Sequence, residues 1–455
     1  MVFSSNASSS AQPPAPILYR YDLRQIDPLA VCQDGTPAYV YVSNPNGGSR
    51  GQESQLSAGH PREKQMFLLY LEGGYWCFDL QTCEDRVVQF FRYASSKNWP
   101  DKVTAQGLLG QYDYAEVVYV YYCTSDAHVA NSTIKRASGS QPAEWQFRGR
   151  VVIDAAMKYL RMRGLGVHGE GKSLHDSGFS GGGDQKLVFA GGSSGARGAM
   201  WLYDDVRQNF PGVEVLGVFD SPLWTQQPIF ANDFLFGVAL DLQKSYSGHL
   251  VHVSLRENVK LFAKTFADSL TPSIFDQECL KHFRSDESWK CLLGEYRLPF
   301  VKPPYFISAS QYDEFFLSYS MGGPLLVLSP TAAAQAYREN YRFEIRKSLA
   351  SARGSVYSSA CYRHVLSSSN DYYTSTAECP ALSSAVDQFL RKPHRKVGYI
   401  SDCEGFDCDC PGDFKYPIAI FGLVLIVSIS ILYRFFLWVC RRRATGSLHE
   451  PLLDK

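Results

Sequence analysis

The sequence predicts an α/β fold with a mostly parallel central sheet. Short apolar runs of strand character alternate with segments of helical periodicity along residues 38–313, an order typical of parallel strands joined by crossover helices. Two of these runs, 213–220 and 304–313, each end in an aspartate, and ligands gather at the carboxyl ends of parallel strands. A third observation, a glycine-rich turn at 191–195 between a strand and a helix, limits the prediction to one type of α/β fold.

The expected elements follow one another along the chain. Residues 1–27 begin rich in Ser, Pro and Ala, and we expect them to be disordered. A helix is expected over 145–164, because apolar residues recur at helical spacing and a glycine ends the run. Strands are expected at 38–42, 65–74, 114–126, 187–192, 213–220 and 304–313.

The composition limits the class of protein. A chain of 455 residues can form one large domain or two ordinary ones. Hydrophobic residues make up 45% and charged residues 20%, with a formal net charge of zero. This composition is globular and gives no reason to expect a nucleic-acid partner.

The stretch LVFAGGSSGARGAM, residues 187–200, carries two adjacent serines in the glycine-rich turn. In α/β hydrolases the nucleophile lies on a strand-to-helix turn of the form G-x-S-x-G, where small neighbours let the backbone bend. The frame 191–195 centres on Ser193, whereas a frame centred on Ser194 has Ala196 in place of its second glycine. We therefore predict an α/β-hydrolase fold with Ser193 as the nucleophile. The alternative is a glycine-rich loop that only connects two elements.

A serine nucleophile needs a base, and in this fold the order along the chain is Ser, Asp or Glu, then His. Three histidines follow the run ending at Asp313: His364, His394 and His449. His394 lies in a basic stretch typical of a solvated loop, and His449 falls in the expected cytoplasmic tail. His364 follows a loop of small residues beside a cysteine, so we expect it to be the base.

Two aspartates compete for the role of orienting acid. Asp313 ends the later strand, which is the usual place for this carboxylate, and we prefer it. Asp220 ends the strand that follows the nucleophile helix and could brace the floor of the site instead. Either aspartate could also simply cap the next helix.

The stretch LEGGYWC, residues 71–77, is placed to form an oxyanion hole. Such a hole needs backbone N–H groups from a glycine-containing loop after an early strand and from the residue after the nucleophile. We expect Gly74, Tyr75 and Ser194 to supply them. The alternative is a plain turn followed by a disulfide loop.

Twelve cysteines point to disulfides in an oxidising compartment. Spacing makes Cys77 with Cys83, and Cys279 with Cys291, candidate pairs, although connectivity cannot be deduced from sequence. No metal site and no cofactor are expected, since no CxxC is matched by a second one or by closely spaced histidines. Asn131, in an Asn-Ser-Thr triplet, is a candidate glycosylation site.

Residues 417–439 form an apolar run long enough to cross a bilayer. Three arginines at 441–443 place the tail, 440–455, in the cytoplasm by the positive-inside rule. The remaining domain, 28–411, with a short linker at 412–416, is then expected in the secretory lumen or outside the cell. A buried core helix is the alternative. The first residues contain no apolar signal segment, so we expect a missing or divergent signal.

Eight motifs together resemble the pectin acetylesterases and Notum-type carboxylesterases. They occur in the family's order and are AVCQDGTPAYVY, LYLEGGYWCFDLQTC, YYCTSD, WQFRG, GGSSGARGAM, YFISASQYDEFFL, CYRH and SDCEGFDCDC. The resemblance covers residues 30–410 and implies a disulfide-linked α/β hydrolase that cleaves carboxylic esters. Carried over motif by motif, it again assigns the triad to Ser193, Asp313 and His364. The chain departs from the family's usual G-[CT]-S-A-G-G, because Ser194 and Ala196 replace an alanine and a glycine.

From these observations we expect a membrane-anchored serine carboxylesterase. The expected substrate is an acylated polysaccharide, which would lose acetyl, or an acylated protein, which would lose a lipid acyl group. The alternative is a catalytically inactive hydrolase-fold module that binds a glycan or a lipid.

Overall fold

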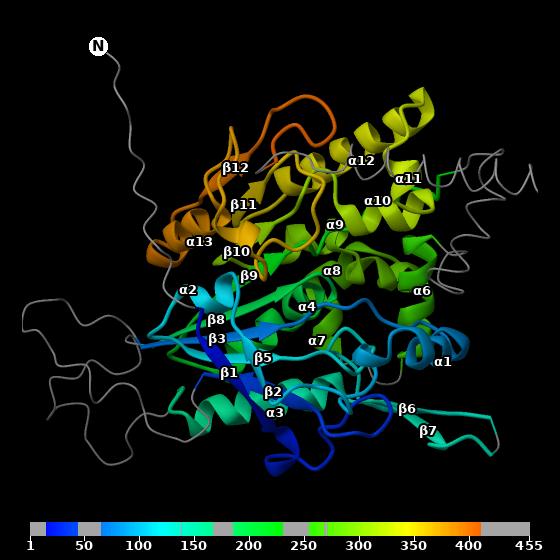
Figure 1. The fold of residues 1–455 in the computed structure, drawn as a ribbon, viewed down its shortest axis with the longest axis vertical. Coiled ribbons are helices and arrows are strands. Elements are labelled where there is room, and N and C mark those ends of the chain that lie inside the picture. Colours follow the sequence, from blue (N-terminus) through cyan, green and yellow to red (C-terminus); the bar gives the residue numbers. More distant parts are fainter. Residues whose placement is uncertain are drawn as a thin grey trace, which may run out of the picture. The chain divides into compact units, whose positions relative to one another are not determined.

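A ten-stranded sheet forms the centre of the fold (Figure 1). The computed structural model describes residues 15–43, 65–137, 139–166, 185–230, 254–267, 270 and 272–410. The strand order across the sheet is β12-β11-β10-β9-β8-β3-β5-β2-β1-β4. The strands are β1 Ile17–Asp22, β2 Tyr39–Val42, β3 Gln65–Leu71, β4 Lys102–Thr104, β5 Glu116–Val120, β8 Gln185–Gly192, β9 Glu214–Asp220, β10 Tyr305–Ser308, β11 Ser355–Ser358 and β12 Gly398–Ile400.

Seven neighbouring strands, from β12 to β5, run parallel, and β2, β1 and β4 continue the sheet antiparallel. Their register aligns the carboxyl ends of the central strands. Leu71 of β3 is paired with Gly191 of β8. Asp220 of β9 is paired with Gly192 on one side and with Ser308 of β10 on the other. The loops that leave these strands therefore begin at one edge of the sheet, and the mostly parallel sheet predicted from the sequence is present.

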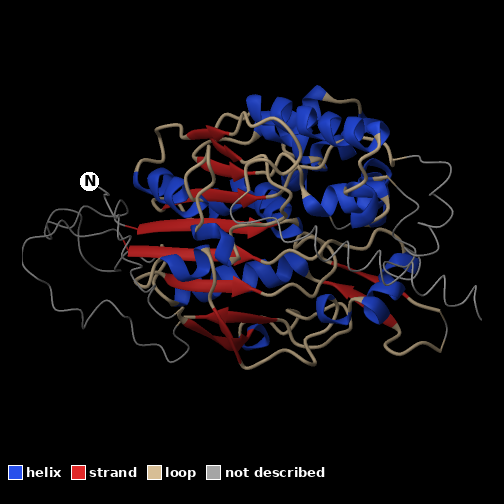
Figure 2. Ribbon diagram, turned by 45° about the horizontal axis from the view of Figure 1, so that its top comes forward, coloured by secondary structure: helices blue, strands red, loops and turns tan. Residues whose placement is uncertain are grey.

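Helices pack around the strands, as Figure 2 shows. The α-helices are α1 Leu80–Gln89, α2 Leu108–Gln111, α3 Gly149–Met162, α4 Ser194–Asn209, α6 Leu255–Thr265, α7 Pro272–Phe275, α8 Gln277–His282, α9 Gly294–Arg297, α10 Glu314–Met321, α11 Pro324–Val327, α12 Ala332–Ala350 and α13 Leu382–Arg391. Short 3-10 helices lie at Leu23–Gln25, Phe91–Tyr93, Ser285–Leu292, Leu298–Phe300 and Asn370–Tyr373. A separate antiparallel pair joins β6 Ser132–Lys135 to β7 Glu144–Phe147.

Helix α4 is the helix that follows the nucleophile turn, and its first ten residues are all buried. It packs against β8 and β9. Strands β3 and β8 are buried along almost their whole length, which is expected where helices cover both faces of a parallel sheet. The turn between β8 and α4 is thus held between buried elements.

Several element boundaries differ from the sequence prediction. Disorder through residue 27 is wrong, because β1 lies within that range and pairs with β2 and β4. The strand expected at 114–126 is only Glu116–Val120, and the chain then turns through positive φ at Ser125. The helix expected from 145 begins at Gly149, because the preceding residues form β7.

Five disulfides are present in the described part of the chain. They join Cys32 to Cys123, Cys77 to Cys83, Cys279 to Cys291, Cys361 to Cys410 and Cys403 to Cys408. The two pairs indicated by spacing are thus formed, and Cys379 is a buried free thiol.

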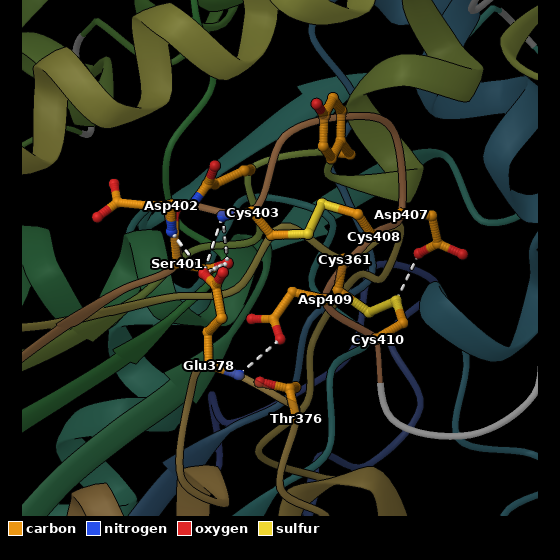
Figure 3. Close-up of a disulfide and its surroundings, with 12 residues drawn as sticks. Cys361, Thr376, Glu378, Ser401, Asp402, Cys403, Asp407, Cys408, Asp409 and Cys410 are labelled. Atoms are coloured by element: carbon orange, nitrogen blue, oxygen red, sulfur yellow. Dashed lines mark hydrogen bonds between the residues drawn. A yellow bond between two sulfur atoms is a disulfide. The ribbon is translucent and has the colours of Figure 1, made fainter.

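The last two disulfides lie together near the end of the described chain (Figure 3). A Glu378 carboxylate oxygen accepts hydrogen bonds from the backbone N–H groups of Asp402, at 2.7 Å, and Cys403, at 2.8 Å. Cys361, Cys410 and Asp407 lie close enough to suggest a metal site. The two cysteine sulfurs, however, are bonded to each other, so they are not thiolate ligands.

No helix within the described ranges is long and apolar enough to cross a membrane. The run at 417–439, for which the sequence predicts a transmembrane helix, lies outside those ranges, as do the linker 412–416, the tail 440–455 and His449.

Candidate active site

The turn between β8 and α4 holds Ser193 in an unusual backbone conformation. Its φ is 55° and its ψ is −124°, a region that non-glycine residues rarely occupy. The glycines around it allow the chains to approach closely. A Cβ at Gly191 would lie 2.6 Å from the backbone of Gly195, and one at Gly195 would lie 2.2 Å from Leu71 O. This sharp, strained turn has the form of a nucleophile elbow.

Asp313 and His364 are brought together by two different loops. His364 Nδ1 donates a hydrogen bond to Asp313 Oδ2 at 2.7 Å. The other oxygen, Asp313 Oδ1, accepts from the backbone N–H of Phe316 at 2.9 Å and caps helix α10. With Nδ1 carrying its proton toward Asp313, Nε2 is the nitrogen left to accept a proton.

The electrostatic environment raises the pKa of His364. Burial lowers this pKa, but the charge of Asp313 and its hydrogen bond raise it, helped by the charges of Asp220 and Glu314. The net result is a pKa above the usual value, so the ring is a stronger base than a free imidazole. His394, the competing histidine, is 82% exposed and lies 4.0 Å from Glu214.

The loop that carries His364 contacts both the chain after β9 and the elbow. Val365 N donates to Ser221 Oγ at 3.1 Å, and a Cβ at Gly192 would lie 2.6 Å from Val365 Cγ1. The residue before Ser193 therefore touches the residue after His364. Ser193 Oγ makes no hydrogen bond to the His364 ring in the described structure; in free enzymes such bonds are often long and tighten when substrate binds.

Asp220 braces this edge of the sheet. Its carboxylate accepts from Ser367 N at 2.6 Å, and its carbonyl accepts from Ser193 N at 2.8 Å. Burial raises its pKa, opposed by hydrogen bonds from Ser367 and Ser308. The two aspartates thus have separate partners, since only Asp313 is hydrogen-bonded to His364.

The loop after β3 lies directly against the elbow. A Cβ at Gly73 would fall 2.7 Å from Ser193 Cβ, and one at Gly74, where φ is 152°, would strike the Tyr93 ring at 2.6 Å. Tyr75 has a φ of 63°. Only glycine suits the position of Gly74, which combines positive φ with this close approach.

The N–H groups expected in the oxyanion hole are not equivalent. Gly74 N, which the sequence assigns to the hole, donates to Ser194 Oγ at 3.0 Å and is thus engaged within the protein. The N–H groups of Tyr75 and Ser194 have no acceptor among the described residues. The acceptor for the Gly74 N–H is the Ser194 hydroxyl, and an alanine at position 194 would leave this N–H without an acceptor.

An aromatic wall stands beside the candidate hole, formed by Tyr75, Trp224, Phe315 and Tyr319. The ring centroid of Tyr75 lies 5.7 Å from that of Trp224, 5.4 Å from that of Phe315 and 5.9 Å from that of Tyr319. Phe315 is also 5.3 Å from the ring of His364. Phe315 and Tyr319 are half-buried, so this apolar surface extends from the candidate base to the hole.

Sequence reasoning missed two buried arginines near the site. Arg197, one turn after Ser193 on α4, is fully buried, and its guanidinium lies 3.1 Å from the Trp224 ring centroid. Its three nitrogens have no hydrogen-bond partner among the residues that the structure describes. Burial holds its pKa well below the usual range, opposed first by the charge of Asp313. The second is Arg86, on α1, which donates to the carbonyl of Gly74.

The comparisons with known proteins give the family. The family model described as Pectinacetylesterase matches residues 23–411. The chain belongs to the pectinacetylesterase family. This match confirms the resemblance inferred from the eight motifs.

Curated members of the family similar to this chain include Notum proteins. Human palmitoleoyl-protein carboxylesterase NOTUM is 23% identical over 383 residues, which is 80% of this chain and 65% of that protein. Xenopus laevis notum2, also named a palmitoleoyl-protein carboxylesterase, is 25% identical over 428 residues, 90% of this chain and 76% of the relative. The chain spans less than two thirds of the length of the human and mouse relatives, 65% and 58%.

A solved structure shows the same fold. The Wnt deacylase Notum from Drosophila superposes with a TM-score of 0.66 at 21% identity, covering 87% of this chain and 99% of that one. The α/β-hydrolase fold predicted from the elbow motif is therefore confirmed.

Proposed function

We propose that this member of the pectinacetylesterase family is a serine carboxylesterase that removes an O-acyl group through an acyl-enzyme on Ser193. The observation that carries the proposal is the 2.7 Å hydrogen bond from His364 to Asp313, made by a loop that packs against the strained elbow at Ser193. A serine, an oriented histidine and free N–H groups are the parts that acyl transfer requires.

The reaction follows from the roles of these atoms. His364 Nε2 accepts the hydroxyl proton as Ser193 Oγ attacks the ester carbonyl, and Asp313 stabilises the imidazolium that forms. The N–H groups of Tyr75 and Ser194 donate to the oxyanion. The C–O bond then breaks, and the leaving alkoxide takes the proton from His364. Water, activated by the same histidine, attacks the acyl-enzyme and releases the carboxylic acid and free Ser193.

The substrate class proposed is an acylated polysaccharide or an acylated protein. The family name points to acetyl on a polysaccharide, and the names of the Notum relatives point to palmitoleoyl on a protein. The aromatic wall supports the proposal of an apolar acyl group beside the hole, because the Phe315 ring lies 5.3 Å from the ring of His364 and 5.4 Å from that of Tyr75.

We also propose that the run at 417–439 anchors the protein, with the catalytic domain in the secretory lumen or outside the cell. The apolar run and the arginines after it support this orientation, and the five disulfides suit an oxidising compartment. Asn131 is exposed and available for glycosylation. Glycosidase-sensitive mass on Asn131, with protease protection of the domain in sealed vesicles, is the expected result. A domain that is accessible from the cytosol and carries free thiols would contradict it.

One relative favours a second candidate function. Zebrafish notum1b, 32% identical over 119 residues and covering 25% of this chain, is named an inactive palmitoleoyl-protein carboxylesterase. A chain without activity would be a hydrolase-fold module that binds a glycan or a lipid.

A labelling experiment separates the two functions. A fluorophosphonate probe should label the full chain on Ser193, and Ser193→Ala should abolish both labelling and hydrolysis of p-nitrophenyl esters. A panel of acetyl, octanoyl and long-chain esters then gives the acyl length. Labelling that persists in Ser193→Ala refutes the assignment. A wild-type protein that neither labels nor hydrolyses any ester supports the inactive module.

A further inference from the structure

Arg86 lies buried behind the candidate oxyanion loop and has no role in the triad. It is 4% exposed and lies in the last turn of α1, a helix capped by reciprocal bonds between Asp79 and Thr82. The disulfide from Cys77 to Cys83 ties this first turn to the loop that continues from β3. The arginine is therefore fixed relative to the loop by a covalent link three residues away.

The guanidinium of Arg86 donates two hydrogen bonds, one to a backbone carbonyl and one to a side-chain hydroxyl. Nη2 donates to the carbonyl oxygen of Gly74, and Nε donates to Ser125 Oγ at 2.7 Å. The carbonyl of Ser125 in turn accepts from Cys77 N at 3.0 Å. Arg86 thus contacts two chain segments, the loop after β3 at Gly74 and the turn at Ser125, which is hydrogen-bonded to the same loop at Cys77.

No carboxylate forms an ion pair with Arg86 among the described residues. Its guanidinium lies instead near the rings of Tyr93 and Tyr122, 5.5 and 5.6 Å from their centroids. Burial lowers its pKa, and the groups whose charges oppose this are Tyr122, Tyr93, Tyr75 and Asp126. A buried cation without a carboxylate partner is costly, so its hydrogen bonds to the loops are the interactions that satisfy it.

The planarity of the peptide bond makes the contact with Gly74 informative. The carbonyl of Gly74 and the N–H of Tyr75 belong to one peptide unit, and in a trans peptide they point in opposite directions. Because Arg86 holds the carbonyl of Gly74, the N–H of Tyr75 is directed to the side of the peptide that faces away from Arg86. The Tyr75 N–H has no acceptor among the described residues, as expected of a group kept for a ligand.

We propose that Arg86 is a positioning residue that holds the Gly74–Tyr75 peptide so that the Tyr75 N–H faces the oxyanion. The inference rests on the proposed function, because it assigns Arg86 to the same reaction. A held peptide is needed here because glycine at position 74 lets the unit rotate at low cost. A loop with φ of 152° at Gly74 and 63° at Tyr75 has no regular structure to keep it in place.

The test compares Arg86→Met, Arg86→Lys and Ser125→Ala in the full chain. Methionine keeps most of the apolar length of the arginine side chain and removes its donors, whereas lysine can still donate one hydrogen bond to Gly74 O. Ser125→Ala removes only the acceptor of the hydrogen bond from Arg86 Nε. With p-nitrophenyl acetate we expect Arg86→Met to lower kcat about 100-fold, the effect of losing one hole donor, with KM within about threefold. Arg86→Lys should restore at least a tenth of wild-type kcat, and Ser125→Ala should stay within about threefold of wild type.

A purely structural arginine would behave differently. If Arg86→Met, Arg86→Lys and Ser125→Ala lose kcat in proportion to their loss of thermal stability, or if folded Arg86→Met keeps kcat within threefold, the inference is overturned. A crystal structure of Arg86→Met gives a readout that does not depend on activity. We expect the Gly74–Tyr75 peptide to be rotated, and an unchanged peptide also overturns the inference. A wild-type protein without hydrolysis or labelling would refute the proposed function, whereas the orientation of this peptide would still decide the role of Arg86.

Discussion

Replacing Ser194 by alanine separates the roles of the two adjacent serines. In the structure the hydroxyl of Ser194 accepts the hydrogen bond from Gly74 N at 3.0 Å, in a site where Ser194 is fully buried. Alanine fits the same volume and keeps its own backbone N–H, which is the group proposed for the oxyanion hole. The substitution therefore removes one hydrogen bond and no proposed catalytic atom.

Ser194→Ala has opposite consequences for folding stability and for kcat. Leaving a buried donor unpaired costs about 1–3 kcal/mol of folding stability, so Ser194→Ala should unfold a few degrees earlier. In the transition state the released Gly74 N–H can donate to the oxyanion, and one such donor contributes about 3 kcal/mol to catalysis. We therefore expect kcat to stay within about threefold of wild type or to rise, even though the protein is less stable.

The measurement is kcat for p-nitrophenyl acetate together with a thermal unfolding curve, for Ser194→Ala beside Ser193→Ala. Ser193→Ala should unfold near the wild-type temperature and show no turnover, which is the reverse pattern. If Ser194→Ala remains folded and loses 100-fold or more in kcat, the hydroxyl itself takes part in the chemistry. The assignment of Ser194 as a backbone donor would then be wrong.

Three further outcomes test the candidate triad and its supports. The kcat/KM of the wild type should rise with pH as His364 loses its proton, with a midpoint above the usual value of about 6.5, because Asp313 raises this pKa; a midpoint at or below 6.5 contradicts the pairing. Asp313→Asn should lower kcat by about 10³–10⁴-fold and move the midpoint to lower pH, since burial then acts on His364 without a negative partner; an unchanged pH profile would exclude Asp313 as the orienting acid. The double substitution Cys77→Ser and Cys83→Ser removes about 2 kcal/mol of chain-entropy stabilisation. We expect kcat to fall further than this loss of folding stability accounts for. Normal turnover by the folded fraction would show that the bridge has a structural role only.

The sequence predicted the parts of the site that local chemistry dictates. The elbow could be found because a Cβ at Gly191 or Gly195 would come within 2.2–2.6 Å of neighbouring backbone atoms, and this requirement for glycine leaves a visible motif. His364 was separable from His394 because charged neighbours mark a surface loop. The candidate disulfides at Cys77–Cys83 and Cys279–Cys291 are close in sequence, so short spacing was enough to suggest them.

Long-range partners were not predictable in the same way. The hydrogen bond between Gly74 and Ser194 joins residues 120 positions apart, and no local pattern announces which hydroxyl will reach which N–H. Arg86 and Arg197 are charged residues on helices, and sequence periodicity alone places such residues on the surface. Strand β1 was missed because its pairing with β2 and β4 joins segments that are far apart in the sequence.

Helix α10 serves two purposes at once. Its cap is Asp313, which divides its two oxygens between the helix and His364, and its first and second turns carry Phe315 and Tyr319 of the aromatic wall. A shift or rotation of this helix would therefore move the base's partner and the acyl surface together. Substitutions that adapt the aromatic wall to another acyl group must preserve the position of Asp313. Changes in side-chain size at Phe315 and Tyr319 can therefore alter specificity, whereas a displacement of the helix would also disturb the partner of His364.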